Sequence, residues 1–362
     1  MRINRLKISN YRNIEELEVE PNSRLNLIFG PNGSGKTNFC EAIHFVSTGD
    51  NIKGSRQKEL INWHADYALV RMGLDDGDQV VVYLKEGEGK KIKINSKSGK
   101  QSELSSKVPT HTFVPDDLYI SKGSPRRRRS LLNSQLSQLK DGYGQALSEY
   151  NAELKKKNTL LKKEDINEEF LTVLSERLVE LGARITVERA DYLLDLNRRL
   201  PEIYGRFVGT EQELNLSYTD DSLVGKSEGE VAEMLSDRLD QNRKKELDRE
   251  TSVVGPHRDK FEYYLDGKRL RTFGSQGELR TAVIATYLAF LDVYESRFDE
   301  FPILVLDDIL SELDRGRGEA FLENLPEEPQ VFMTTATRSP SFRKLSGEFK
   351  VLKIEQGEID ER

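Results

Sequence analysis

The chain has 362 residues, more than one hydrophobic core usually holds, so we expect two lobes. Charged residues make up 32% of it and hydrophobic residues 36%, which is typical of a soluble and rather polar protein. The formal net charge of −7 argues against a globally basic fold that coats nucleic acid. Any contact with DNA or RNA must therefore use a local basic patch.

Cysteine usage and hydropathy predict where the protein works. The single cysteine, Cys40, excludes an internal disulfide and fits a reducing cytosol. We find no apolar run long enough to cross a bilayer, and residues 1–6 lack the apolar core of a signal peptide. The four histidines do not have metal-site spacing, which argues against a zinc site. We expect a cytoplasmic protein with no membrane partner.

The stretch from Gly30 to Thr37 fits G-x-x-x-x-G-K-[ST], the phosphate-binding P-loop, between an apolar strand and a helical pattern. Its glycines allow backbone N–H groups to point inward as an anion nest. Lys36 would place its charge on the β- and γ-phosphates of ATP, and the Thr37 hydroxyl would ligand Mg²⁺. The predicted nucleotide-binding residues of this stretch are Gly30, Asn32, Gly33, Ser34, Gly35, Lys36, Thr37 and Asn38.

Two alternating stretches precede the P-loop, at residues 2–8 and 14–20, and both have the period of a half-buried strand. The turn between them would bring Arg12 near the nucleotide, so Arg12 joins the predicted nucleotide-binding residues. A solvated loop arginine is the alternative. Downstream, residues 51–66 look irregular, with Trp63 as their anchor. Strand patterns follow at 68–72, 79–84, 91–94 and 110–114, the second after an Asp-Gly turn signal.

From about residue 121 the pattern becomes helical. Helices are expected at about 138–161, 167–199 and 228–248, the first two as an antiparallel hairpin, and residues 209–227 look loop-like. We therefore expect residues 1–120 and 251–362 to form one domain and residues 121–250 a helical lobe. Two basic clusters in this lobe are candidate DNA contacts: Arg126, Arg127, Arg128 and Arg129, and Lys155, Lys156 and Lys157. A solvated helical face is the alternative for both clusters.

A second phosphate-recognising turn is predicted at Ser275, Gln276 and Gly277, directly before a helical pattern whose free N–H groups would favour an anion. One P-loop and two such helix starts in one chain suggest that the second reads the γ-phosphate held by another copy. We therefore expect a head-to-tail homodimer with two ATP molecules between the subunits.

The apolar run 301–306 ends in Asp307 and Asp308, which is the pattern of a strand buried on both faces of a parallel sheet. An acid at the carboxyl end of such a strand would lie beside the P-loop. Asp307 is then the predicted Mg²⁺ ligand, together with Thr37, and Asp308 is the candidate to polarise the attacking water, which makes Asp308 and Lys36 the predicted catalytic residues.

These motifs, in this order, resemble an ABC-type ATPase head, and more narrowly the RecF-like recombination mediators, relatives of the heads of structural-maintenance-of-chromosomes proteins. The resemblance covers nearly the whole chain and rests on residues 8–14, 123–128, 255–259, 274–277 and 306–314. It implies an α/β fold, with a mixed sheet of parallel core and antiparallel segment and an inserted helical lobe.

The resemblance also implies a function: a weak ATPase that dimerises with ATP bound, binds duplex DNA and single/double-strand junctions, and helps to load RecA with RecR and RecO. On this view Lys36, Thr37 and Asp307 hold phosphate and Mg²⁺, Asp308 is the base, and Ser275 and Gly277 act on the other subunit's nucleotide.

The chain departs from the usual ABC pattern in ways that favour slow hydrolysis. Asp308 stands where glutamate is usual, no Gln-loop residue is evident beyond Asp116, and Thr334 to Thr337 occupy the place of the switch histidine. For His257 we favour a histidine held by its turn neighbours over a helper at the dimer face. Two other classes stay open: a transporter ATPase subunit and an ATP-dependent nuclease.

Overall fold

The computed structural model describes residues 1–52, 56–218, 220–336, 349–355 and 357–361. The chain forms two compact units, one of residues 1–118 and 290–362 and the other of residues 119–289. The second division thus falls at residue 289, not at residue 250 as expected. Residues 251–289 belong with the helical unit, because strand β10 (Phe261–Leu265) pairs along its whole length with strand β9 (Leu214–Tyr218).

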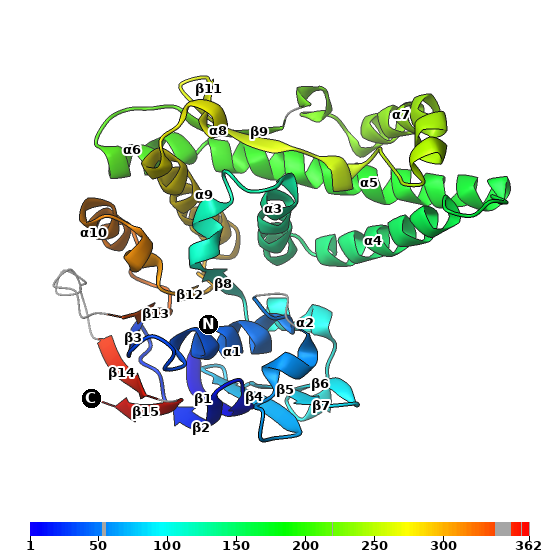
Figure 1. Ribbon diagram of the computed structural model, residues 1–362. Helices are drawn as coiled ribbons and strands as arrows, with labels where there is room; N and C mark the ends of the chain where they lie inside the picture. Colours follow the sequence, from blue (N-terminus) through cyan, green and yellow to red (C-terminus); the bar gives the residue numbers. More distant parts are fainter. Residues whose placement is uncertain (53–55, 219, 337–348, 356, 362) are drawn as a thin grey trace. The chain divides into compact units, whose positions relative to one another are not determined.

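The first unit contains two six-stranded sheets (Figure 1). One is wholly antiparallel, in the order β2-β1-β4-β5-β6-β7; its strands are β1 (Ile3–Tyr11), β2 (Ile14–Val19), β4 (Tyr67–Leu74), β5 (Gln79–Lys85), β6 (Gly89–Ile94) and β7 (Lys97–Ser98). The other has the order β15-β14-β3-β13-β12-β8 and is parallel except for its edge strand β15; its strands are β3 (Leu25–Phe29), β8 (Thr110–Phe113), β12 (Ile303–Leu306), β13 (Val331–Thr335), β14 (Phe349–Glu355) and β15 (Glu358–Glu361). The predicted mixed α/β architecture is confirmed.

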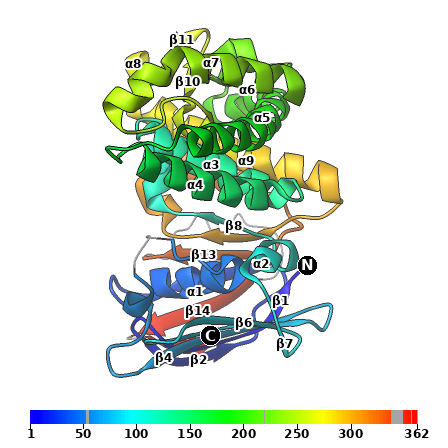
Figure 2. The ribbon, with the colours of Figure 1, turned by 90° about the vertical axis from the view of Figure 1, so that its right-hand side faces the viewer.

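Helix α1 (Lys36–Thr48) packs between these two sheets, as Figure 2 shows. Its apolar side chains, among them Phe39, Ile43 and Val46, belong to one core with residues of both sheets. A helix buried on both sides has little freedom to shift, so its first turn holds a well-defined position. The unit also has α2 (Gln101–Lys107) and α10 (Arg315–Glu323), and the short 3₁₀ helices η1 (Gln57–Leu60), η2 (Pro115–Tyr119) and η5 (Ile309–Glu312).

The second unit is mainly helical, with a small antiparallel sheet in the order β11-β10-β9. The antiparallel hairpin expected from the sequence is formed by α4 (Tyr143–Leu160) and α5 (Glu168–Asn197), and α5 also packs against α7 (Glu228–Arg249). The helices are α3 (Pro125–Leu139), α4 (Tyr143–Leu160), α5 (Glu168–Asn197), α6 (Leu200–Val208), α7 (Glu228–Arg249), α8 (Leu270–Phe273) and α9 (Gln276–Phe298), with η3 (Asp221–Leu223), η4 (Pro256–Arg258) and strand β11 (Lys268–Arg269). The division between the units falls within α9.

Three local expectations were wrong. The helix expected from 138 begins at Tyr143, because Gly142 takes a left-handed φ of 77° and separates α3 from α4. The loop expected at 209–227 contains strand β9, whose side chains are buried alternately. Trp63 is not an anchor, since 96% of its surface is exposed. Among the helices of the described residues, none has the length and apolar character needed to cross a membrane.

Candidate nucleotide-binding site

The P-loop lies between β3 and α1, and its glycines meet specific requirements. A Cβ on Gly30 would lie 2.2 Å from the carbonyl oxygen of Ile354, so no other residue fits there without a shift of β14. Gly33 and Gly35 take φ values of 80° and 113°, in the left-handed region that side chains rarely adopt. Gly35 is the residue before the first turn of α1, so the loop delivers free N–H groups of this helix start to one place.

Lys36 is 7% exposed, and its ammonium group curls back over the loop. It donates to the carbonyl oxygens of Gly30 at 2.7 Å and of Pro31 at 2.9 Å. The hydroxyl of Ser34 is buried and has no hydrogen-bond partner within the described residues. A buried cation, an unpaired hydroxyl and an open helix start together fit an oxygen-rich anion such as a polyphosphate.

The turn before β2 supports the P-loop from one side. Asn13 accepts a hydrogen bond from the Asn38 side chain at 2.7 Å and donates to the carbonyl oxygen of Gly33 at 3.4 Å. The backbone N–H of Gly357 donates to the carbonyl oxygen of Ser34 at 2.9 Å. Sequence reasoning missed Asn13 as a site residue. Its only sequence signal is its place in the hairpin turn that leads into the P-loop strand.

Arg12 lies in the same turn and is tied to the P-loop helix. Its guanidinium donates to both carboxylate oxygens of Glu41 on α1, at 2.8 and 2.9 Å, and to the carbonyl oxygen of Glu59 at 3.1 Å. Glu41 is 1% exposed, so this bidentate pair is largely removed from water. The solvated arginine considered as an alternative is therefore wrong. Nucleotide contact by Arg12 stays a prediction.

Asp307 and Asp308 follow β12 at the edge of the parallel sheet where β3 and β13 also end. Asp307 is 4% exposed, and its Oδ1 accepts hydrogen bonds from the hydroxyls of Thr37 at 3.2 Å and of Thr334 at 2.8 Å. The Thr334 hydroxyl in turn accepts from the backbone N–H of Asp308 at 2.8 Å. The structure thus brings the P-loop threonine and the predicted Mg²⁺ ligand Asp307 into direct contact.

Asp308 has a φ of 47°, in the left-handed region. Outside glycine such a conformation is uncommon, although aspartate and asparagine adopt it more readily than other residues. Thr334, one of the residues found where a switch histidine is usual, contacts both acids through its hydroxyl, and a switch role for it stays a prediction. Thr337 lies outside the described residues. Asp116, the substitute considered for the Gln loop, is exposed in η2 and stays a prediction.

The donor atoms around Asp307 fit Mg²⁺. A carboxylate and a threonine hydroxyl are hard oxygen ligands, and nucleotide sites use few protein ligands for Mg²⁺ because phosphates and water supply the rest. Among the described residues there is no group of three or more His, Cys, Asp and Glu side chains that could hold a metal by itself. Cys40 lies nearby on α1, where burial, and then the charge of Asp307, raise the pKa of its thiol well above the usual value.

The second turn lies in the other unit, at the start of α9. Ser275 and Glu278 form a reciprocal cap: the Ser275 N–H donates to the Glu278 carboxylate at 2.7 Å, and the Glu278 N–H donates to the Ser275 hydroxyl at 3.2 Å. Ser275 and Gln276 are exposed, and Gly277 is half-buried. The turn therefore presents a preformed helix start to solvent, but action on another subunit stays a prediction.

The basic clusters divide into exposed and buried members. Arg126, Arg127, Lys155 and Lys156 are exposed, as a nucleic-acid contact requires. Arg128 is buried and forms an ion pair with Glu262 at 3.1 Å, so it was wrong as a DNA contact. Lys157 is wrong for the same reason, because it is 1% exposed and lies 2.8 Å from Glu246.

Arg129 and His257 both belong to the interior of the helical unit. Arg129 donates to the backbone oxygen of Asp259 at 2.6 Å and is half-buried. The Nδ1 of His257 lies 2.6 Å from the Tyr150 hydroxyl, and its Nε2 lies 3.2 Å from the backbone oxygen of Ser252. Burial lowers the pKa of His257 to about 4, so the imidazole is neutral. The favoured structural role for His257 fits, but its partners are Tyr150 and Ser252.

Comparisons with known proteins agree with this geometry. Residues 2–360 match the family model described as "RecF/RecN/SMC N terminal domain". The "DNA replication and repair protein RecF" of Clostridium perfringens strain SM101 is 35% identical over 364 residues, and that of an Exiguobacterium strain is 32% identical over 370 residues; in both cases 99% of each chain is covered. The chain belongs to the RecF family.

Solved structures place the fold in the same family. The structure described as "recombination mediator protein RecF-ATP in RecFOR pathway" has a TM-score of 0.90 and 31% identity, covering 100% of this chain and 97% of that one. An Smc head domain from Pyrococcus furiosus, with a TM-score of 0.57 and 18% identity, shares the fold alone. The RecF relationship makes the chain a member of the ABC-type ATPases, as its motifs predicted.

Proposed function

We propose that this chain is an ATP-dependent DNA-binding protein of replication-linked recombinational repair. The observation that carries the proposal is the contact between Thr37 and Asp307, which assembles a P-loop and an acidic strand end into one site for ATP and Mg²⁺. The RecF relatives are named for DNA replication and repair, and one was solved with ATP. The near-complete match in length supports this function over the transporter and nuclease alternatives.

ATP binding would use the helix start behind Gly35, the ammonium of Lys36 and the hydroxyl of Ser34. Mg²⁺ would be held by Thr37 and Asp307 and would neutralise charge on the transferred phosphoryl group. Asp308 would orient water from its left-handed backbone position, with Thr334 holding it beside Asp307. An aspartate is one methylene shorter than the usual glutamate, so the proposed ATP hydrolysis is slow. The proposal also includes dependence of this hydrolysis on DNA.

ATP would also join two copies of the chain, through the Ser275 turn of one and the P-loop of the other. The turn supports this proposal because Ser275 and Gln276 are exposed at the start of α9. Duplex DNA and single/double-strand junctions would be held mainly through phosphates, with Arg126 and Arg127 as exposed candidates, so binding would weaken steeply with salt. The RecFOR pathway in the description of the solved relative supports RecO and RecR as partners in loading RecA.

Light scattering of the full chain, with ATP and Mg²⁺ and without nucleotide, tests the proposal. The wild type should change from monomer to dimer with ATP, whereas Ser275→Arg should bind ATP and stay monomeric. Thr210→Arg is the matched control, because Thr210 is exposed in the same unit but lies outside this turn. An unchanged wild-type mass with ATP bound, or a dimer of Ser275→Arg, would refute the shared site.

A further inference from the structure

The α4–α5 hairpin ends where residues 161–167 join the two helices (Figure 1). A hollow of about 470 Å³ lies at this end of the hairpin. It belongs to neither the nucleotide site nor the Ser275 turn. Most of its lining is apolar or consists of lysine: Ala152, Lys155, Lys156, Leu160, Lys163 and Phe170. The hollow therefore combines an apolar floor with a cationic rim.

The floor is built on a small core of its own. Leu160 is 5% exposed and packs in a cluster with Leu161, Leu171 and Leu174. Phe170 stands beside this cluster with 47% of its surface exposed. Uncovered aromatic surface over a packed base favours an apolar side chain from another molecule.

The rim carries lysine ammonium groups, two of which form no ion pair with other described residues of the chain. Lys156 lies 2.7 Å from Glu153, but Lys155 and Lys163 form no ion pair within the described residues. Glu164 and Asp165 follow Lys163 in the connection, yet neither lines the hollow. The cavity therefore has an excess of positive charge directly above apolar surface.

Buried and capped groups hold this arrangement in place. The pair of Lys157 and Glu246 fastens α4 against α7, so the neighbouring Lys155 and Lys156 point to the outside. The side chain of Asn167 caps α5 by accepting from the Phe170 N–H at 2.8 Å, which fixes the first turn that carries the phenylalanine. A preformed site of this kind loses little entropy when it binds.

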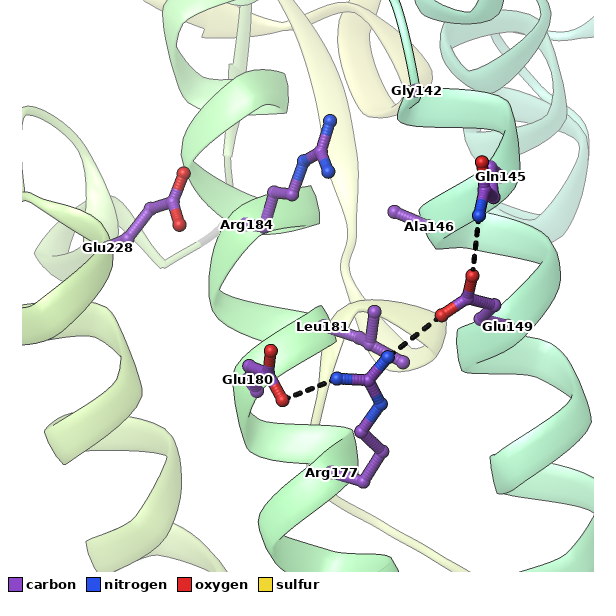
Figure 3. Close-up of a pocket in the computed structure, with 9 residues that line it drawn as sticks. All are labelled: Gly142, Gln145, Ala146, Glu149, Arg177, Glu180, Leu181, Arg184 and Glu228. Atoms are coloured by element: carbon purple, nitrogen blue, oxygen red, sulfur yellow. Dashed lines mark hydrogen bonds and ion pairs between the residues drawn. The ribbon is translucent and has the colours of Figure 1, made fainter.

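Another hollow of the helical unit, about 380 Å³ between α4, α5 and the start of α7, lacks this combination (Figure 3). There Arg177 lies between Glu149 and Glu180, at 2.9 and 2.6 Å, so its charge is already balanced. Arg184 likewise pairs with Glu188 at 3.0 Å. The arginines of that hollow are therefore already paired with glutamates and give no reason to expect a charged ligand.

We infer that the hairpin end binds an acidic segment of a partner protein that inserts an apolar side chain between Phe170 and Leu160. Carboxylates of the segment pair with Lys155 and Lys163, which form no ion pair within the described residues. This goes beyond the proposed function, because it requires neither ATP nor a dimer. Lysine stems can cover apolar surface while their ammonium groups reach anions, and in this hollow lysines share the lining with Leu160 and Phe170.

Nucleic acid fits the same lysines less well. A duplex presents hydrated phosphates and has no apolar group to fill the hollow. An unstacked base could lie on Phe170, but its polar edge needs partners. Thr159, which also lines the hollow, already donates to the backbone oxygen of Lys155 at 2.9 Å. Charge and shape together therefore favour an acidic peptide.

Fluorescence anisotropy without nucleotide tests the inference, with a fluorescein-labelled peptide of sequence DDDDLF as the probe. The full chain should bind it, and binding should weaken at least fivefold for Phe170→Ala and for the pair Lys155→Glu and Lys163→Glu. Lys268→Glu should bind like the wild type, because Lys268 is exposed on the β10–β11 hairpin and does not line the hollow. The peptides SSSSLF and DDDDAA should each bind at least fivefold more weakly than DDDDLF.

Folding of each variant is checked by its urea midpoint, since Phe170 is half exposed and its loss should leave the core of the hairpin intact. The inference is overturned if DDDDLF does not bind at 1 mM, or if it binds Phe170→Ala and the charge-reversed pair like the wild type. It is also overturned if an unlabelled fifteen-residue oligothymidylate displaces the labelled peptide completely and DDDDAA binds as well as DDDDLF, because that result would assign the lysines to phosphates. Loss of ATP-dependent dimerisation in Ser275→Arg should not affect peptide binding, so the two proposals fail separately.

Discussion

The Thr334 hydroxyl donates to Oδ1 of Asp307 at 2.8 Å and accepts from the backbone N–H of Asp308 at 2.8 Å. One side chain on β13 therefore positions both acids that follow β12. The strands are parallel neighbours, so their carboxyl ends meet and the threonine reaches across.

Thr334→Val should slow ATP hydrolysis by roughly 10- to 100-fold, the usual cost of losing a residue that orients a metal ligand. The isopropyl group keeps the shape but leaves Oδ1 of Asp307 and the N–H of Asp308 with one partner fewer. ATP affinity measured by calorimetry should change much less than the turnover number. Thr334→Ser keeps the hydroxyl and should restore turnover, whereas equal turnover in wild type and Thr334→Val would contradict this role.

Lys36→Ala should weaken ATP binding roughly 10- to 150-fold, because a hydrogen bond to a charged group contributes about 1.5–3 kcal/mol. At an ATP concentration that saturates the wild type, the variant should stay monomeric in light scattering and bind DNA as the wild type does without nucleotide. A variant that dimerises and binds DNA tightly with ATP would contradict ATP gating.

Lys157→Met should lower the free energy of unfolding by about 3–5 kcal/mol, because Glu246 would then be a buried charge without its partner. Adding Glu246→Gln should recover most of this loss. The amide oxygen can still accept from the Ser252 hydroxyl and the Val253 N–H, which both donate to Glu246 now. Urea unfolding monitored by circular dichroism gives these values.

Lys155→Met is the matched control, since it removes an exposed lysine two residues away and should change stability by less than about 0.5 kcal/mol. If both lysine variants lose the same stability, the buried ion pair does not hold α4 against α7.

Trp63→Ala should change stability by less than about 0.5 kcal/mol, because 96% of the indole surface is exposed. Since Trp63 is the chain's one tryptophan, its fluorescence reports this loop alone. Acrylamide should quench it almost equally in the native protein and in urea. Strong protection from quenching in the native protein without nucleotide would contradict the exposed position.

Stability should fall as the pH drops from about 6.5 to 5, because burial lowers the pKa of His257 to about 4 from an ordinary value of 6.5. The native imidazole stays neutral in this range, whereas the imidazole of the unfolded chain takes up a proton. Protonation stabilises the unfolded state, so the free energy of unfolding falls by roughly 1.4 kcal/mol per pH unit for this histidine. Burial acts in the same direction on His44, with a pKa of about 4, and His111, with a pKa of about 3.

Urea unfolding at pH 7.5, 6.5, 5.5 and 5.0 measures this slope. His257→Asn should reduce the slope of the free energy of unfolding against pH by the equivalent of about one proton taken up on unfolding. Above pH 7.5 the contribution of His257 to this slope should be absent. A slope unchanged by His257→Asn would show that this imidazole does not titrate differently on unfolding.

Local patterns of residues determined much of this protein by themselves. The sequence predicted three features: the P-loop, the acidic end of β12 and the turn before α9. Each of them depends on residue types at fixed spacing along one segment. Strand alternation, apolar runs and helical periodicity predicted most of the antiparallel sheet, part of the parallel sheet and the α4–α5 hairpin for the same reason. The RecF relationship followed from the order of these motifs and is confirmed by the comparisons.

Tertiary packing decided what spacing cannot express. Arg126 to Arg129 are equivalent in sequence, yet Arg128 enters the interior to meet Glu262, which lies 134 residues away. Lys157 differs from Lys155 and Lys156 only by facing Glu246. β9 is a strand because β10 pairs with it, and Trp63 is exposed because none of the elements that the structure describes covers it. Such outcomes depend on which residue, distant in sequence, the fold brings into contact with a given side chain. A charged side chain is buried only where a residue of opposite charge is buried with it.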